Sequence, residues 1–325
     1  MTDPYGRALD YLRLSVTDMC NLRCVYCMPE EGAAQLPREA MLRVEECVRL
    51  CRVLAGLGIR RVKITGGEPL LRNGLCALVR ALALIPGVEQ VTLTTNGILL
   101  GGFLSQLRDA GIEAVNVSLD TLNPAAFRRI ARRDGLEQVL QAIGQAYATG
   151  LPLKINCVPI RGLNDGELVH IAGLAKERDI AVRFIELMPA GRAAAFQGLS
   201  EAEVRAALEA EYGALSPFRG RLGNGPAEYY AAEGFAGKIG FIGAMSRGFC
   251  ERCNRLRLTS AGVLKACLSS GRSVDLGTLL RRGADDGEIA EAVRELVRRK
   301  PRAHSFSARY GAEYHRADEM FRVGG

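Results

Sequence analysis

Residues 11–28 read YLRLSVTDMCNLRCVYCM, an apolar run followed closely by three cysteines. The run Tyr11–Val16 predicts a β-strand, so Cys20, Cys24 and Cys27 fall in the loop after it. Barrel enzymes carry their chemistry in such loops, at the carboxyl ends of the strands. Three thiolates at this spacing can bind three irons of a cubane cluster and leave the fourth iron open to a substrate. A ferredoxin would close its cluster with a fourth cysteine.

Strand-like and helix-like segments alternate up to about residue 191. Strands are expected at Tyr11–Val16, Arg61–Thr65, Val91–Thr95, Ala114–Leu119, Leu153–Pro159 and Val182–Leu187. Helices are expected at Glu39–Leu57, Gly74–Ile85, Phe103–Ala110, Leu136–Thr149 and Asp165–Lys176. This α/β order predicts a parallel sheet with helices packed outside it. Because parallel crossovers are right-handed, an open or partial barrel, or a doubly wound sheet, is expected.

The regular alternation of strand-like and helix-like segments ends after about residue 191. A helix is expected at Ser200–Glu211, and further helices near Leu276–Arg282 and Asp286–Lys300. Short strands are expected at Glu228–Ala232, Lys238–Ile242, Asn254–Thr259 and Val263–Cys267, the last two joined in a hairpin. We therefore expect a barrel over residues 1–195 and a smaller α+β layer over residues 196–325 that covers the barrel mouth.

Composition narrows the class of protein. The 325 residues are 48% hydrophobic and 24% charged, as in ordinary folded proteins. The first residues lack the pattern of a signal peptide, and the longest apolar stretch, Leu75–Val88, contains Arg80 and is too short to cross a membrane. We expect a cytoplasmic protein with no membrane partner. The net charge of +7 comes without a basic tract, which favours a pocket for a phosphorylated small molecule over nucleic acid.

Ten cysteines without a secretion signal argue against a disulfide scaffold. Three crowd one end of the chain and three more, in the pattern Cys250-x2-Cys253-x13-Cys267, crowd the other. The expected hairpin brings Cys267 toward Cys253, so this second group can also hold a cluster with one open iron. Structural zinc with a remote fourth ligand is the alternative. The other four cysteines are expected to pack in the core.

At the first cysteine group the sequence resembles the radical S-adenosylmethionine superfamily. The resemblance rests on the cysteine spacing, on Tyr26 before the last cysteine, and on Gly66-Gly67-Glu68-Pro69 after a predicted strand. Zinc binding and a thiol redox pair at Cys24 and Cys27 are the alternatives. The resemblance implies a partial (βα)6 TIM-type barrel, a [4Fe-4S] cluster and bound S-adenosylmethionine. It implies cofactor contacts from Tyr26, Gly66, Gly67, Glu68, Ser118 and Met188.

Single basic residues interrupt several of the predicted strands. A cation that points into a barrel is costly unless an anion meets it, and several from separate strands would suit a triphosphate. Outward orientation into water is the alternative for any one of them. No Walker-type loop is present, so phosphoryl transfer is not expected. The residues concerned are Arg13, Lys63, Lys154, Arg183, Arg255 and Arg257.

Over almost its whole length the chain is similar to the GTP 3′,8-cyclase family of molybdenum cofactor biosynthesis. The stretches that carry this similarity are residues 11–18, 64–70, 93–97, 183–189 and 249–259 and the terminal Gly324-Gly325. The similarity implies a GTP site formed by Arg13, Lys63, Thr94, Lys154, Arg255, Leu256 and Arg257. It implies catalytic roles for Arg183, Arg255, Arg257, Gly324 and Gly325.

The same similarity implies two [4Fe-4S] clusters with separate tasks. The first reduces S-adenosylmethionine to a 5′-deoxyadenosyl radical that takes H3′ of GTP, and C3′ then bonds to C8. The second holds guanine through its open iron. A pyranopterin monophosphate synthase would take the product, flavodoxin or ferredoxin would supply electrons, and a homodimer is left open.

The residues by themselves leave two other functions open. Peptide-modifying radical enzymes also carry extra clusters in a C-terminal extension, usually with more than three cysteines. An electron carrier or a zinc-stabilised nucleic-acid binder would not be an enzyme at all. Cleavage of S-adenosylmethionine separates the enzymes from the last group.

Overall fold

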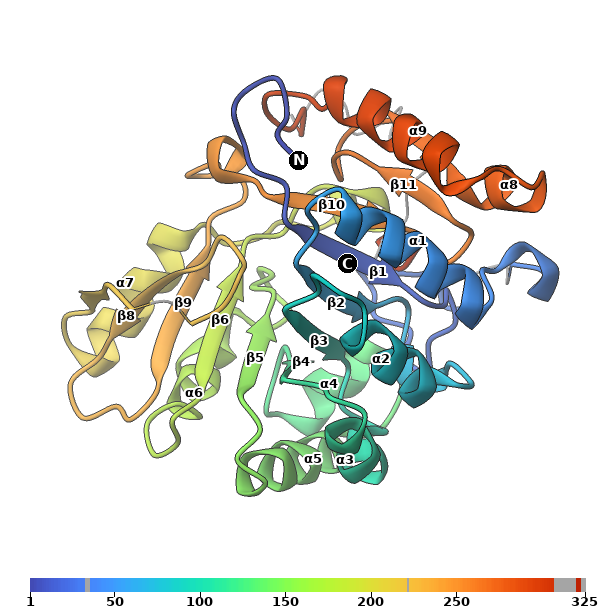
Figure 1. Ribbon diagram of the computed structural model, residues 1–325. Helices are drawn as coiled ribbons and strands as arrows, with labels where there is room; N and C mark the ends of the chain where they lie inside the picture. The colour runs from blue at the N-terminus through green and yellow to red at the C-terminus, as the bar shows by residue number, and fades with distance from the viewer. Residues whose placement is uncertain (33–35, 221, 307–319, 323–325) are drawn as a thin grey trace.

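The centre of the computed structural model, which describes residues 1–32, 36–220, 222–306 and 320–322, is one twelve-stranded sheet (Figure 1). Six strands lie side by side in chain order and pair in parallel. They are β1 (Tyr11–Ser15), β2 (Arg61–Thr65), β3 (Gln90–Thr95), β4 (Ala114–Ser118), β5 (Leu153–Cys157) and β6 (Ala181–Ile185). All six predicted strands are thus confirmed, and the sheet is a partial barrel.

Helices connect these strands and cover the outer face of the sheet (Figure 1). They are α1 (Val44–Gly56), α2 (Leu75–Ala83), α3 (Leu100–Asp109), α4 (Pro124–Ala131), α5 (Leu136–Ala148) and α6 (Leu168–Gly173). Helix α4 was not expected from its short, arginine-containing sequence. Its start is nevertheless encoded, because the Asn123 side chain accepts hydrogen bonds from the backbone of Ala125 and Ala126, and Pro124 occupies the first turn.

The later strands belong to the predicted C-terminal extension, and they continue the barrel sheet at both of its edges. Strand β9 (Lys238–Ile242) pairs in parallel with β6, and β10 (Arg255–Leu258) pairs in parallel with β1. The predicted hairpin of β10 with β11 (Val263–Lys265) is confirmed. The edges are β12 (Ser273–Asp275) on one side and β8 (Glu228–Ala231) with β7 (Ser216–Phe218) on the other. Alternating residues predict a strand but not its partner, so this pairing with the barrel edges could not be foreseen. The division at residue 195 stays a prediction.

Three more helices complete the C-terminal part. Helix α7 (Glu201–Tyr212) packs against α6, and α8 (Leu276–Arg281) and α9 (Asp286–Arg298) pack against α1 on the outside of the barrel (Figure 1). Ser200 and Asp285 cap α7 and α9 by accepting a backbone hydrogen bond, each with a glutamate three residues later. In the part of the chain that the structure describes, no helix is long and apolar enough to span a membrane.

The core lies between the sheet and its helices. On β1 and β2, Leu12, Leu14, Val62 and Ile64 are almost inaccessible to solvent and belong to this core. The residues between them have side chains on the opposite face, toward the barrel interior, because successive side chains of a strand alternate. The interior is therefore free to carry polar groups.

A substitution at Gly237, just before β9, tests how the C-terminal part packs on the barrel. A Cβ atom there would overlap the carbonyl oxygen of Ile180 and lie 2.6 Å from that of Arg178. We expect Gly237→Ala to lower the free energy of unfolding by about 3 kcal/mol, because backbone must move. The control Gly144→Ala lies in α5 with open space around it, and should stabilise by about 0.5 kcal/mol. Urea unfolding measures both; equal midpoints would contradict the packing described.

Candidate active site

A cavity of about 290 Å³ opens at the carboxyl ends of the strands, and both cysteine groups line it. We call Cys20, Cys24 and Cys27 the first trio, and Cys250, Cys253 and Cys267 the second trio. All six thiols are free and partly accessible. Predicted site residues that also line the cavity are Arg13, Tyr26, Gly66, Gly67, Thr94, Ser118, Met188, Arg255 and Arg257.

The first trio lies in the loop after β1, as expected. Backbone amides of Cys27 and Met28 donate to the carbonyl of Cys24, which forms a tight turn. The Leu22 amide and the Asn96 side chain point at the Cys20 sulfur, at 3.4 and 3.8 Å. Burial raises the pKa of Cys20 to about 11 and that of Cys24 well above the ordinary value. The positive charge of a bound metal cluster would favour the thiolate form of these side chains.

The two glycines of the Gly66-Gly67 turn are required by a neighbouring backbone. A Cβ atom on Gly66 would lie 2.5 Å from the Thr17 carbonyl, and one on Gly67 would overlap the Met19 carbonyl. The amides of Gly67 and Glu68 donate to those same two carbonyls at 2.7 Å. The turn thus holds the segment that leads directly into Cys20.

Glu68 occupies a different position from the one its predicted role suggests. Its side chain is fully buried and is not among the cavity-lining residues. The carboxylate accepts hydrogen bonds from the Thr95 hydroxyl and the Asn96 amide, both at 2.7 Å, and from the Leu70 amide at 3.1 Å. Burial raises its pKa to about 7, against the effect of these hydrogen bonds. Glu68 joins the loops after β2 and β3, and a contact with the cofactor stays a prediction.

A second set of contacts fixes the other side of the first trio. The Tyr26 hydroxyl donates to Asp120 at 2.6 Å, and Asp120 also accepts from the Val158 amide at 2.9 Å. Asp120 follows β4 directly and lines the cavity beside Ser118 and Met188. Asp120 was not predicted; its place just after Ser118 at a strand end was the available signal.

The second trio is assembled from a short helical turn and the hairpin. Residues Cys250–Arg252 form the turn, Cys253 follows it, and Cys267 comes just after β11. Burial opposes ionisation of Cys253, but the charges of Arg255 and Lys300 and hydrogen bonds from Arg255 lower its pKa. Among the described residues, no three His, Cys, Asp or Glu side chains are arranged to hold a single metal ion. In a cubane each thiolate binds a different iron, so the trio need not meet at one point.

Cations line up inside the barrel, as the strand pattern predicted. Arg257, Arg13 and Lys63 stand abreast on β10, β1 and β2, and Lys154 and Arg183 come from β5 and β6. We call these five the interior basic cluster.

The cations of the interior basic cluster act on one another. Burial lowers the pKa of Lys63, and Arg183, Arg13 and Lys154 lower it further. Burial likewise lowers the pKa of Arg257, with Arg13 next. The buried Nε of Arg183 has no hydrogen-bond partner among the described residues. This arrangement is suited to an anionic ligand with several charges.

The remaining predicted residues are placed as follows. Lys63, Lys154 and Arg183 are not among the residues that line the 290 Å³ cavity. Leu256 has its side chain in the hydrophobic core, on the face opposite Arg255 and Arg257. Gly324 and Gly325 lie outside the described residues. Phe321, three residues earlier, is buried and lines the cavity.

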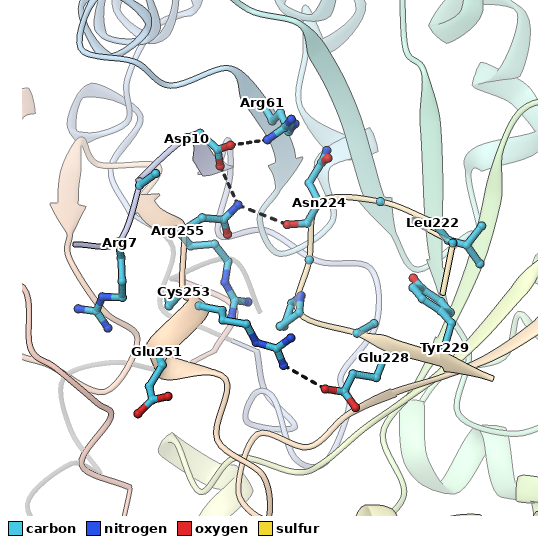
Figure 2. Close-up of a pocket in the computed structure, with 18 residues that line it drawn as sticks. Arg7, Asp10, Arg61, Leu222, Asn224, Glu228, Tyr229, Glu251, Cys253 and Arg255 are labelled. Atoms are coloured by element: carbon cyan, nitrogen blue, oxygen red, sulfur yellow. Dashed lines mark hydrogen bonds and ion pairs between the residues drawn. The ribbon is translucent and has the colours of Figure 1, made fainter. Parts of the chain in front are cut away.

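A second pocket, of about 550 Å³, lies at the amino ends of the strands (Figure 2). Figure 2 shows Arg61 pointing at Asp10, which also accepts a hydrogen bond of 2.7 Å from Asn254. Cys253 and Arg255 line both pockets. The Lys154 amino group lies close to Gly223 of this pocket, since a Cβ atom there would be 3.1 Å away. Lys154 of the interior basic cluster therefore lies next to this pocket; nothing in residues 220–229 predicted this.

Comparisons with known proteins agree with this geometry. Residues 14–175 match the Radical SAM superfamily, and residues 180–306 match the family described as Molybdenum Cofactor Synthesis C. A protein of Streptococcus suis, SuiB bound to S-adenosylmethionine, shares the fold with a TM-score of 0.61 at 14% identity, over 87% of this chain and 67% of its own.

Similar curated proteins are named GTP 3′,8-cyclase. The protein of Pelotomaculum thermopropionicum is 48% identical over 94% of this chain and 95% of its own. That of Moorella thermoacetica is 46% identical over the same shares, and that of Syntrophomonas wolfei is 42% identical over the full length of both. The chain belongs to the GTP 3′,8-cyclase family of the radical S-adenosylmethionine superfamily.

Proposed function

We propose that the chain converts GTP to (8S)-3′,8-cyclo-7,8-dihydroguanosine 5′-triphosphate, the first step of molybdenum cofactor biosynthesis. The main observation in favour of GTP as the substrate is the interior basic cluster, which lies in a barrel whose mouth holds both cysteine trios. A triphosphate carries several negative charges, which suits a group of buried cations from separate strands. The names of the relatives support the same substrate.

The first trio and its surroundings fit a [4Fe-4S] cluster with bound S-adenosylmethionine. The cavity beside the trio is lined by Gly66, Gly67, Ser118 and Met188. Together the cluster and S-adenosylmethionine would supply the radical chemistry that removes the hydrogen at C3′ of the ribose. The protein itself would hold S-adenosylmethionine and GTP in line with each other and exclude water from the site.

The second trio fits a second [4Fe-4S] cluster. Its thiols are free, line the same cavity as the first trio, and have Lys300 and Arg255 close enough to favour the Cys253 thiolate. We assign guanine to the open iron of this cluster. The triphosphate then extends toward Arg13, Lys63 and Arg257, and Arg183 lies nearest the reacting centre.

Several further assignments follow from the family. We place the enzyme in the cytoplasm, where thiols stay reduced, with flavodoxin or ferredoxin as electron donor and a pyranopterin monophosphate synthase as the next enzyme. The terminal Gly324-Gly325 would enter the cavity beyond Phe321, which already lines it. A homodimer is compatible with these assignments.

The reaction itself is tested with GTP deuterated at C3′. Anaerobic protein with reconstituted clusters, dithionite and S-adenosylmethionine should transfer the deuterium to 5′-deoxyadenosine. The guanosine product should be an isomer of GTP that lacks the label. Mass spectrometry measures both compounds. Unlabelled 5′-deoxyadenosine without a GTP product would refute the substrate, and no 5′-deoxyadenosine from intact clusters would refute the enzyme class.

Substitution of Gly67 tests the turn that holds the first trio. A methyl group in Gly67→Ala must displace the Met19 carbonyl and with it the start of the cysteine loop. We expect cleavage of S-adenosylmethionine to fall roughly a hundredfold, because small misplacements of reacting groups have effects of this size. Formation of 5′-deoxyadenosine is the measurement. Gly102→Ala on α3, which meets no atom within 4 Å, is the control and should keep wild-type activity.

GTP binding should depend on pH through Lys154. Burial and the charge of Arg183 lower its pKa to about 8, so the free enzyme loses this charge as the pH rises through that value. A bound triphosphate favours the protonated amine, so the Kd for GTP should increase roughly tenfold between about pH 7 and 9. Calorimetry measures the Kd. In Lys154→Arg, which stays charged, this increase should disappear; an unchanged increase would exclude Lys154 as its cause.

A further inference from the structure

The N-terminal segment contains a buried ion pair outside the cavity lining of the carboxyl end. Asp3 and Arg7 are 6% and 7% exposed, and Arg7 Nε lies 2.5 Å from Asp3 Oδ2. The other carboxylate oxygen of Asp3 accepts from the backbone amides of Tyr5 and Arg7, both at 3.0 Å. Asp3 therefore fixes both the local turn and the direction of the guanidinium.

The remaining donors of Arg7 connect the N-terminal segment to two distant parts of the chain. Its Nη1 donates to the carbonyls of Cys250 and Arg302, each at 2.7 Å, and its Nη2 donates to that of Pro301 at 2.6 Å. Cys250 belongs to the second trio. A planar guanidinium can satisfy three carbonyls and a carboxylate at once, and a lysine cannot.

Lys300 does the same on the other side of the second trio. Its side chain is buried, and its amino group donates to the carbonyl of Arg255 at 3.0 Å and to that of Ala266. Ala266 is adjacent to Cys267, and Arg255 is two residues after Cys253. The segment that begins at Lys300 also brings the His304 amide to 3.3 Å from the Cys250 sulfur.

We propose that Arg7, oriented by Asp3, and Lys300 are positioning residues that hold the three cysteines of the second trio for an iron–sulfur cluster. The proposal rests on the second cluster of the proposed function. The trio sits on a short turn and just beyond a hairpin, and these carbonyl contacts fix its backbone. The first trio relies instead on the Gly66-Gly67 turn and on residues after β3 and β4, so loss of Arg7 should affect one cluster only.

The test counts and identifies clusters in Arg7→Met, Arg7→Lys and Asp3→Asn, with Arg298→Met as control. Arg298 forms exposed ion pairs on α9. After anaerobic reconstitution the wild type and the control should hold about eight irons, the content of two [4Fe-4S] clusters. The electron paramagnetic resonance (EPR) spectrum of the reduced protein should contain one signal that S-adenosylmethionine shifts and one that GTP shifts.

The three variants should keep the signal that S-adenosylmethionine shifts and lose the GTP-sensitive one, with about four irons left. Where a variant still takes up some iron at the second trio, limiting chelator should remove that iron at least roughly tenfold faster than from the wild type, because loss of a residue that supports a metal ligand weakens binding by about this factor. Arg7→Lys should not rescue it, because the fork geometry is required. Lys300→Met should alter the GTP-sensitive signal and its reduction potential.

Other outcomes would overturn the proposal. Both signals and eight irons in Arg7→Met would show that the second trio does not need this contact. Loss of both signals would assign Arg7 to the fold as a whole. If Arg7→Lys kept the second cluster, the positive charge of Arg7 and not its fork geometry would be what the second trio needs. A wild type with four irons and only the first signal would refute the second cluster itself, before any variant is compared.

Discussion

A row of buried positive charges inside the barrel is the constraint on which the rest of this structure depends. Arg257, Arg13 and Lys63 stand in one row across three strands, and the strongest charges that act on Lys63 are other cations. Such a group raises the free energy of the empty protein, and an anionic ligand removes that cost. The well-packed core on the other face of the same strands, with Leu12, Leu14 and Ile64 almost inaccessible, offsets it.

Around this interior, backbone contacts determine where the chemical groups lie. Gly66 and Gly67 have no room for a side chain because the segment before Cys20 packs directly on them. Glu68 extends the same contact to the loop after β3. A motif that looks like a ligand-binding turn is thus also a structural joint between two loops. Its residues serve the cofactor through the position of Cys20 as well as through any direct contact.

Much of the fold could be predicted from the sequence because two short-range patterns determine it. Alternation of apolar residues predicted the six strands β1–β6, and single cations inside those runs predicted the polar interior. The spacing of the cysteines predicted two groups in one site. The pairing of β9 and β10 with the barrel edges, the pocket around Asn224 and the contacts of Arg7 involve residues far apart in the chain. No local pattern encodes such contacts, and Arg7 looks like any other arginine near a chain end.

The two trios also differ in when the chain can complete them. Contacts of the first trio stay within the first part of the chain, as between Asn21 and Asn96 or Tyr26 and Asp120. Arg7, at the second trio, contacts a carbonyl 295 positions away. The N-terminus of a chain emerges from the ribosome first. The first trio can therefore form while synthesis continues. The second trio can form only when almost the whole chain has emerged. Iron delivered during synthesis would therefore meet one finished site, and the other would be filled after release.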